Sequence, residues 1–167
     1  MKTTLPHLIA ALALVANGPL ALAHDAQHAH PGGPAAATAQ KAWGKPGTAK
    51  SVSRSVTLTM DDNMRFTPDQ LSFRQGETVR FVIRNQGKLM HELVIGTKKE
   101  LDEHAAMMVK SPAMAHDEPS MAHVAAGRTG QLIWTFNRAG EFDFACLIAG
   151  HYQAGMVGKI SVAAAAR

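Results

Sequence analysis

The sequence predicts an all-β domain, built as a sandwich or barrel of short strands with Greek-key connections, that carries one short helical insertion. In several segments between residues 56 and 162, apolar and polar side chains alternate with the period of a β-strand. Glycine, asparagine and aspartate interrupt these segments at short intervals, which is typical of turns in all-β domains. One stretch, residues 98–110, is rich instead in helix-forming residues.

The predicted strands follow one another along the chain. In the first, Val56, Leu58 and Met60 alternate with polar neighbours, and the turn-forming residues 61–63 end it. Further turn residues separate the later segments. In chain order, the predicted strands cover 56–60, 79–84, 93–95, 131–136, 141–145 and 157–162. Between the first two, the apolar residues Phe66, Leu71 and Phe73 precede a turn at residues 75–77.

Residues 98–110 are predicted to form a helix that lies on the sheets. Leu101, Ala105 and Met108 fall at positions i, i+4 and i+7 and therefore share one helix face. Pro112 is expected to prevent the helix from continuing.

The segments that precede the domain have the composition of a targeting sequence and a linker. Residues 1–23 combine an early lysine, a short apolar run and a small-x-small ending, which predicts a cleaved signal peptide and a periplasmic protein. An uncleaved membrane anchor is the alternative, but the apolar run is too short to span a bilayer, and we expect no membrane insertion after cleavage. Residues 24–50, rich in Ala, Gly, Pro and His, predict a flexible linker, which leaves 51–167 as the folded domain.

The distribution of charge argues against a nucleic-acid partner. The chain has 17 Lys+Arg against 13 Asp+Glu, and these cations are scattered along it. A nucleic-acid-binding surface would gather the cations into a patch or stripe. A mildly basic surface does permit docking to an acidic protein surface. We expect a monomer.

Cys146 is the only cysteine of the chain. Exported proteins meet an oxidising compartment, where cysteines usually pair, but one cysteine cannot form an internal disulfide. Cys146 is therefore a buried inert thiol, half of an intermolecular disulfide, or a metal ligand.

The residues after Cys146 favour the metal ligand. His151 and Met156 follow it, each after a gap of four residues, and glycines precede both. Thiolate, imidazole and thioether together suit copper, and a site with two histidines, one cysteine and a distant axial methionine is the blue-copper arrangement. His91, which lies between two predicted strands, is the candidate for the second histidine. Each residue has an ordinary structural alternative, such as a surface imidazole or a core methionine, but their joint order favours copper.

Several further motifs lie between residues 56 and 162: Phe66-Thr-Pro68, Gly76-Glu-Thr-Val-Arg-Phe81, Asn85-x-Gly87, Met90-His91-Glu92, Cys146 through Met156, and Gly158-x-Ile160. With these motifs, residues 56–162 resemble the cupredoxin family of azurins, plastocyanins and pseudoazurins. The resemblance implies a cupredoxin-like Greek-key β-sandwich with one type 1 copper. By the same resemblance, His91 and His151 would bind through ring nitrogens, Cys146 through its thiolate and Met156 weakly along the axis, with His151 as the electron port.

Two regions depart from a minimal member of that family and contain further soft ligands. The longer helical region 98–121 and the histidine-bearing tail resemble periplasmic cupredoxins associated with copper tolerance. Thioethers and imidazoles at this density could hold additional, weakly bound copper, although a solvated loop and core-facing methionines would explain them equally. The auxiliary candidates are His104, Met107, Met114, His116, Met121 and His123 in the insertion, and His24, His28 and His30 in the tail.

Three functions remain to be compared. The first is a redox-active periplasmic copper protein that serves copper tolerance or homeostasis and meets a copper-handling protein. The second is a soluble carrier that shuttles electrons between respiratory partners and meets a redox protein. A copper enzyme would need His-x-His or His-Cys-His motifs for further copper ions, and neither stands beside Cys146; we therefore expect no enzyme. A purely structural β-sandwich would leave Cys146 unexplained.

Overall fold

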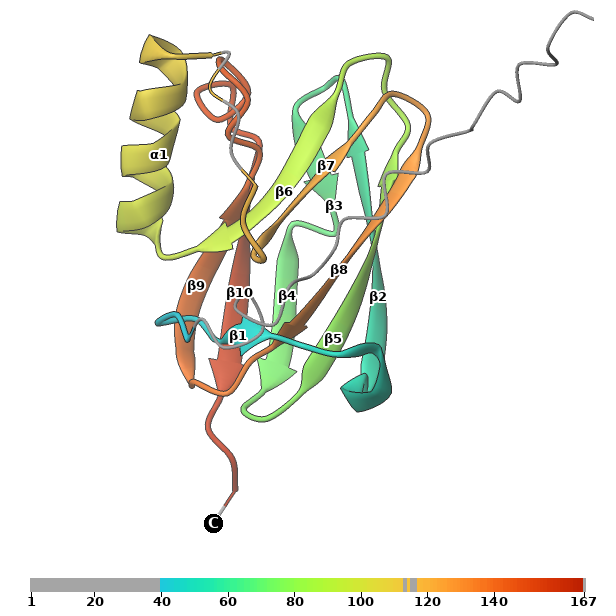
Figure 1. The fold of residues 1–167 in the computed structure, drawn as a ribbon, viewed down its shortest axis with the longest axis vertical. Helices are drawn as coiled ribbons and strands as arrows, with labels where there is room; N and C mark the ends of the chain where they lie inside the picture. Colours follow the sequence, from blue (N-terminus) through green and yellow to red (C-terminus); the bar gives the residue numbers. More distant parts are fainter. Residues whose placement is uncertain (1–39, 113, 115–116, 167) are drawn as a thin grey trace, which may run out of the picture. The chain divides into compact units, whose positions relative to one another are not determined.

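A computed structural model describes residues 40–112, 114 and 117–166, which form two five-stranded sheets and one α-helix (Figure 1). The first sheet has the order β1-β8-β5-β2-β3 and the second the order β4-β10-β9-β6-β7. The strands are β1 (Lys45–Pro46), β2 (Arg54–Asp61), β3 (Arg65–Thr67), β4 (Gln70–Arg74), β5 (Thr78–Asn85), β6 (His91–Gly96), β7 (Met121–Val124), β8 (Thr129–Thr135), β9 (Gly140–Ala145) and β10 (Val157–Ala163).

Strand pairing within the sheets is mixed. β2 runs parallel to β5, and β10 runs parallel to β4, whereas the other pairs are antiparallel. Parallel neighbours cannot be joined by a tight hairpin, so the chain crosses repeatedly from one sheet to the other. The two sheets enclose a single core, and the predicted β-sandwich is confirmed.

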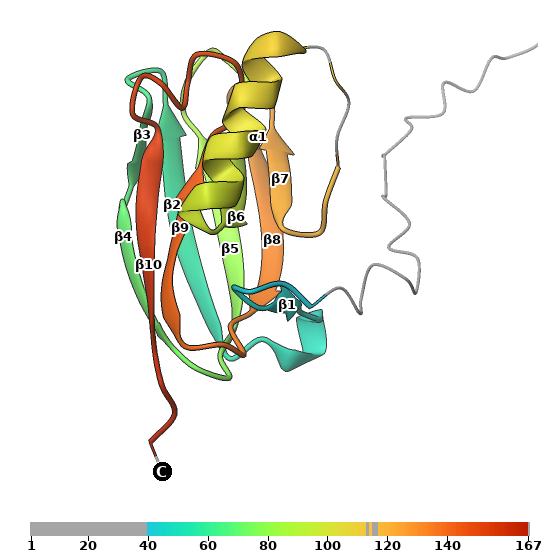
Figure 2. The ribbon, with the colours of Figure 1, turned by 90° about the vertical axis from the view of Figure 1, so that its left-hand side faces the viewer.

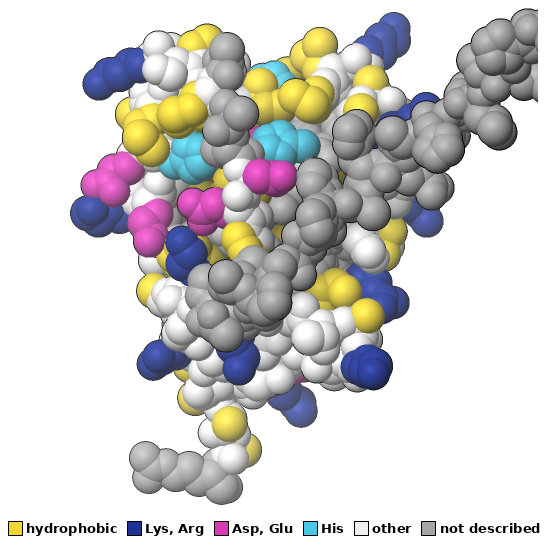
Figure 3. All heavy atoms as spheres, viewed as in Figure 1, with side chains coloured by type: hydrophobic (Ala, Val, Ile, Leu, Met, Phe, Trp, Pro, Cys, Tyr) yellow, Lys and Arg dark blue, Asp and Glu magenta, His cyan; other side chains and the backbone are white. Residues whose placement is uncertain are grey.

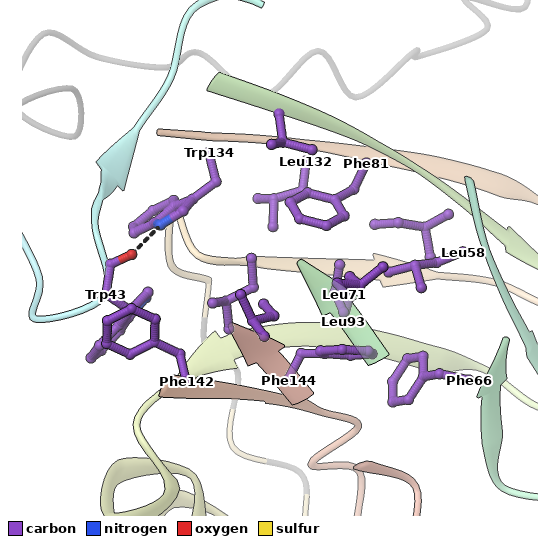
Figure 4. Packing of buried hydrophobic residues seen from close by; sticks show 14 of the residues in the cluster. Trp43, Leu58, Phe66, Leu71, Phe81, Leu93, Leu132, Trp134, Phe142 and Phe144 are labelled. Atoms are coloured by element: carbon purple, nitrogen blue, oxygen red, sulfur yellow. Dashed lines mark hydrogen bonds between the residues drawn. The ribbon is translucent and has the colours of Figure 1, made fainter. Parts of the chain in front are cut away.

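Aromatic side chains from both sheets meet in that core (Figure 4). The ring of Phe66 on β3 meets Phe144 on β9 edge to face, with 5.0 Å between centroids. Phe73 on β4 meets Phe81 on β5 in the same way, at 6.0 Å. Each pair joins one sheet to the other, and such pairs stabilise the fold beyond the burial of their area.

The predicted helix is present as α1 (Lys98–Lys110) and covers the outer face of the second sheet (Figure 2). Thr97 and Glu100 form a capping box at its first turn, which satisfies amides that the helix itself cannot pair. Leu101, Ala105 and Met108 are its buried residues, as the spacing predicts. They pack in a second apolar cluster with side chains from β6, β7 and the end of β9.

The fold begins earlier than the predicted boundary at Ser51, so residues 40–50 are not a flexible linker. Lys45 and Pro46 pair with β8, and a 3₁₀ turn at Ala49–Ser51 follows. Trp43 is only 4% exposed, and its backbone carbonyl accepts a hydrogen bond of 3.0 Å from the indole N–H of Trp134. A two-residue strand has no hydrophobic period of its own, which is why the sequence pattern misses it.

β7 was not predicted either, because Met121 and His123 were assigned, from the sequence, to the helical insertion and its surroundings. The predicted signal peptide 1–23 and linker residues 24–39 lie outside the described residues. Within the described part of the chain, no helix has the length and apolar character needed to cross a membrane.

Candidate metal centre

Three of the predicted copper ligands come together at one end of the sandwich. His91 begins β6, Cys146 directly follows β9, and His151 lies in the loop that leads to β10. One ligand atom from each of the three side chains lies within 4.8 Å of the other two. His151 Nδ1 is 3.2 Å from His91 Nδ1 and 3.3 Å from Cys146 Sγ.

These separations fit a single bound ion. Two atoms bound to one metal at about 2.0–2.3 Å stand roughly 3.3–4.0 Å apart when the geometry is tetrahedral or trigonal. Two imidazoles and one thiolate form a borderline-soft donor set that copper and zinc both accept. The geometry therefore supports a mononuclear metal site, and the donor set restricts the metal to a few candidates.

The loop from Cys146 to Met156 is closed by its own backbone. The Cys146 amide donates to the carbonyl of Met156, and the Met156 amide donates to the carbonyl of His151, both at 3.1 Å. Gly150 and Gly155 have φ of +90° and +89°, a region that favours glycine. The loop thus holds its three predicted ligand residues at fixed separations along the backbone.

Met156 is fully buried and belongs to the same apolar cluster as Cys146. Its backbone is hydrogen-bonded to both of the other ligand residues in the loop. An axial thioether would have to reach the ion from this buried position. The axial role of Met156 stays a prediction.

Asp62 fixes the orientation of the His91 ring, and sequence reasoning missed it. The Oδ1 atom of Asp62 lies 3.2 Å from His91 Nε2, on the side of the ring opposite the atom that faces His151. The amides of Lys88 and Leu89 donate to the same carboxylate, and the Lys88 hydrogen bond is the main cause that lowers the pKa of Asp62. An ionised Asp62 accepts the Nε2 proton, which leaves Nδ1 of His91 free to bind a metal.

Without a metal, the environment of Cys146 favours the neutral thiol. Burial is the main cause that raises its pKa to about 12, and the charge of Glu92 adds to this. The backbone N–H groups of Glu92 and Ile148 donate to the sulfur and oppose the shift. A bound cation would reverse the balance because it pairs directly with the thiolate.

His151 differs from His91 in its exposure. The His91 side chain is fully buried, whereas His151 is partly exposed. Burial is the main cause that lowers the pKa of His151, and the neighbouring His91 lowers it further. The neutral imidazole, which is the metal-binding form, is therefore favoured at neutral pH.

The structure separates the auxiliary candidates from one another. Met121 is buried on β7, and His123 forms an ion pair with Glu92. His104 and Met107 line a pocket of about 200 Å³ beside α1, with Met121 also in its wall, and Met114 is exposed. On the face drawn in Figure 3, acidic side chains gather mainly on the side where α1 lies, and histidine side chains lie above them in the upper half of the molecule. His116 and the tail histidines His24, His28 and His30 lie outside the described residues.

Comparison with known proteins agrees with this geometry. Residues 52–163 match the model of the copper binding proteins of the plastocyanin/azurin family. The chain belongs to this family, the cupredoxins, as the sequence motifs predict.

More specific relatives are known. The copper-resistant cuproprotein CopI of Rubrivivax gelatinosus is 46% identical over 140 residues, which cover 84% of this chain and 81% of the relative. The protein of the same name from Pseudomonas aeruginosa is 36% identical, over 73% of this chain and 83% of its own length. Among solved structures, auracyanin B has a TM-score of 0.60 at 22% identity, and covers 74% of this chain and 99% of its own. That likeness confirms the fold.

Proposed function

We propose that this chain is a periplasmic, non-catalytic cupredoxin that binds one type 1 copper ion and serves copper tolerance. His91, Cys146 and His151 would bind the ion, with Met156 as the axial ligand. The observation that carries the proposal is the cluster of two imidazole nitrogens and one sulfur at 3.2 and 3.3 Å. The names of the relatives, copper-resistant cuproproteins, support the physiological role.

Copper in this donor set would supply one-electron redox chemistry. The protein's part is to hold the ligands so that they move little between the two oxidation states. Asp62 fixes the His91 ring, and the hydrogen-bonded loop fixes Cys146 and His151. The buried positions of His91 and Cys146 exclude water from that side, so the partly exposed His151 would be the route for electrons.

A soluble electron carrier is the second candidate, and one observation favours it. Leu89 and Met90 directly precede His91, and their side chains are 48% and 51% exposed. Large exposed apolar side chains beside a redox centre suit a transient docking surface. Under either function, the partner would be a periplasmic redox protein or a copper-handling protein that meets this end of the sandwich.

Visible absorption and EPR spectroscopy of the copper-loaded protein test the site. A thiolate-to-Cu(II) charge-transfer band is expected, and Cys146→Ser should abolish it. Met156→Leu should keep copper and raise the reduction potential, because Cu(II) loses its weak axial donor. Met108→Leu replaces another buried methionine, on α1, and should leave the potential unchanged. A colourless copper-loaded protein would contradict the proposal.

Growth in copper separates the two physiological roles. Loss of the gene should make cells copper-sensitive if the protein serves tolerance, and a copy with Cys146→Ser should fail to restore growth. Normal growth of the deletion strain in copper, together with slowed respiration, would favour the electron carrier.

We also propose that the side chains of His104 and Met107 bind additional copper weakly. Both line the pocket beside α1, and imidazole and thioether are ligands for Cu(I). Metal analysis should then give more than one copper per chain, and His104→Ala with Met107→Ala should lower the ratio while the charge-transfer band persists. A ratio of one in the unaltered protein would exclude auxiliary binding.

A further inference from the structure

Glu92 is a buried acid beside the metal centre. It follows His91 in β6, and its side chain is fully buried. Among the described residues it is the one acidic side chain in the buried class. A buried carboxylate is unfavourable unless hydrogen bonds and an opposite charge compensate it.

Both oxygens of Glu92 have partners that connect it to the site. Oε1 accepts a hydrogen bond of 2.8 Å from the amide of Leu147, the residue directly after Cys146. The backbone N–H of Glu92 donates to the sulfur of Cys146. Glu92 therefore holds the cysteine from two directions, through its own amide and through the next amide along the chain.

The second oxygen of Glu92 meets a histidine on the neighbouring strand. Oε2 lies 2.8 Å from Nε2 of His123, whose side chain is 32% exposed. The two residues stand directly opposite each other in the antiparallel pairing of β6 with β7. A protonated His123 would supply the opposite charge, and its partly exposed side chain lies beside the buried carboxylate.

We propose that the Glu92–His123 pair tunes the reduction potential of the copper centre, with Glu92 also positioning the loop that carries Cys146. This inference rests on the copper site proposed above. With two neutral imidazoles and one thiolate, the site carries a net charge of +1 with Cu(II) and zero with Cu(I). A nearby negative charge stabilises the +1 state and lowers the potential, and a nearby positive charge has the opposite effect.

The two members of the pair should therefore shift the potential in opposite directions. Glu92→Gln keeps an oxygen that can accept the Leu147 amide but removes the negative charge, so the potential should rise. His123→Gln removes the compensating positive charge, so the potential measured at pH 6 should fall. A role that was only structural gives no reason for opposite signs.

Spectra separate positioning from charge. Glu92→Ala removes both the hydrogen bond and the charge, and it should alter the visible and EPR spectra of the copper-loaded protein. Glu92→Gln should preserve these spectra because the hydrogen bond is retained. If Glu92 acts both by positioning the loop and by its charge, Glu92→Gln should restore the wild-type spectra but not the wild-type reduction potential.

Glu141→Gln is the matched control, because it removes the same charge from an exposed position on β9. Five residues of extended strand place it about 16 Å from Cys146, so its effect on the potential should be much smaller. Shifts of the same sign in the Glu92 and His123 variants, or shifts no larger than the control, would overturn the inference. If Glu92→Gln does not fold, the His123→Gln variant is sufficient as a test: an unchanged or raised reduction potential in that variant overturns the inference. A wild-type protein without the charge-transfer band would overturn the proposed copper site as well, whereas a normal band with unmoved potentials would overturn this inference only.

Discussion

Asp62→Ala is expected to weaken copper binding although Asp62 is not itself a predicted ligand. Its carboxylate accepts from His91 Nε2 at 3.2 Å and from the amides of Lys88 and Leu89 at 2.8 and 3.2 Å. Alanine would leave the ring nitrogen of the buried His91 without this acceptor. The proton could then move to Nδ1, the nitrogen that faces the site, and block it.

Two independent arguments set the size of this effect. Loss of the acceptor for a buried donor costs about 1–3 kcal/mol. Loss of a carboxylate that orients a metal-binding histidine typically weakens metal binding by about 10–100-fold, which corresponds to about 1.4–2.7 kcal/mol. We therefore expect the copper dissociation constant of Asp62→Ala to rise by about 10–100-fold.

Competition with a colorimetric Cu(I) chelator measures this change. Asp61→Ala is the matched control, because the Asp61 carboxylate belongs to the same turn but accepts from the amide of Asn63. Asp62→Asn keeps one acceptor oxygen without the charge and should lie between the wild type and Asp62→Ala. An Asp62→Ala affinity equal to that of Asp61→Ala would refute the argument that Asp62 orients His91.

Two further predictions concern stability in the metal-free protein. Trp43→Ala should lower the free energy of unfolding by about 3–5 kcal/mol, since Trp43 is a buried core residue. Urea denaturation measures this loss. A loss close to that of Val109→Ala, a substitution at an exposed position, would contradict the prediction. Glu92 is the main cause that raises the pKa of His123 above its ordinary value of 6.5. A pKa raised by folding stabilises the protein fully below the unfolded-state pKa, and this stabilisation is lost as pH rises through the folded-state pKa. The stability difference between wild type and His123→Gln should therefore be largest below pH 6.5 and shrink at higher pH, and a difference that grows with pH would contradict the pairing.

The long strands and the helix were predictable because each carries its own pattern. β2 and β5 alternate apolar and polar residues, and α1 has both a buried face and a capping box. β1 and β7 lack such a pattern. They are held by pairing with β8 and β6, and by burial of Trp43 and Met121. Strand formation at these places depends on tertiary contacts, which a single segment of sequence does not encode.

The candidate site shows the same division between local and distant information. Cys146, His151 and Met156 lie in one loop, so their spacing alone suggested a shared ion. His91 is distant in sequence from the other three, so its assignment depended on its position between two predicted strands and on the family resemblance. The partners of the ligands are harder still to predict: Asp62 is 29 residues from His91, and Glu92 is 55 residues from Leu147.

Such partners are difficult to recognise because their residue types have common alternative roles. Asp62 occurs in a run of turn-forming residues, and such residues often only break a strand. Glu92 stands in a strand whose other residues are all buried, where an acid reads as an interruption of the apolar pattern. Only the three-dimensional contacts show that each carboxylate lies directly behind a predicted ligand.

These contacts also explain why the predicted ligands differ in exposure. His91 and Cys146 are buried and held from behind by Asp62 and Glu92, so that side of the site is closed and hydrogen-bonded. His151 lies on the loop and is partly exposed. A centre that exchanges electrons needs ligands that do not move and one edge that a partner can approach. For the proposed electron-transfer role, the Asp62 and Glu92 carboxylates would meet the first requirement, and the loop between β9 and β10 would meet the second.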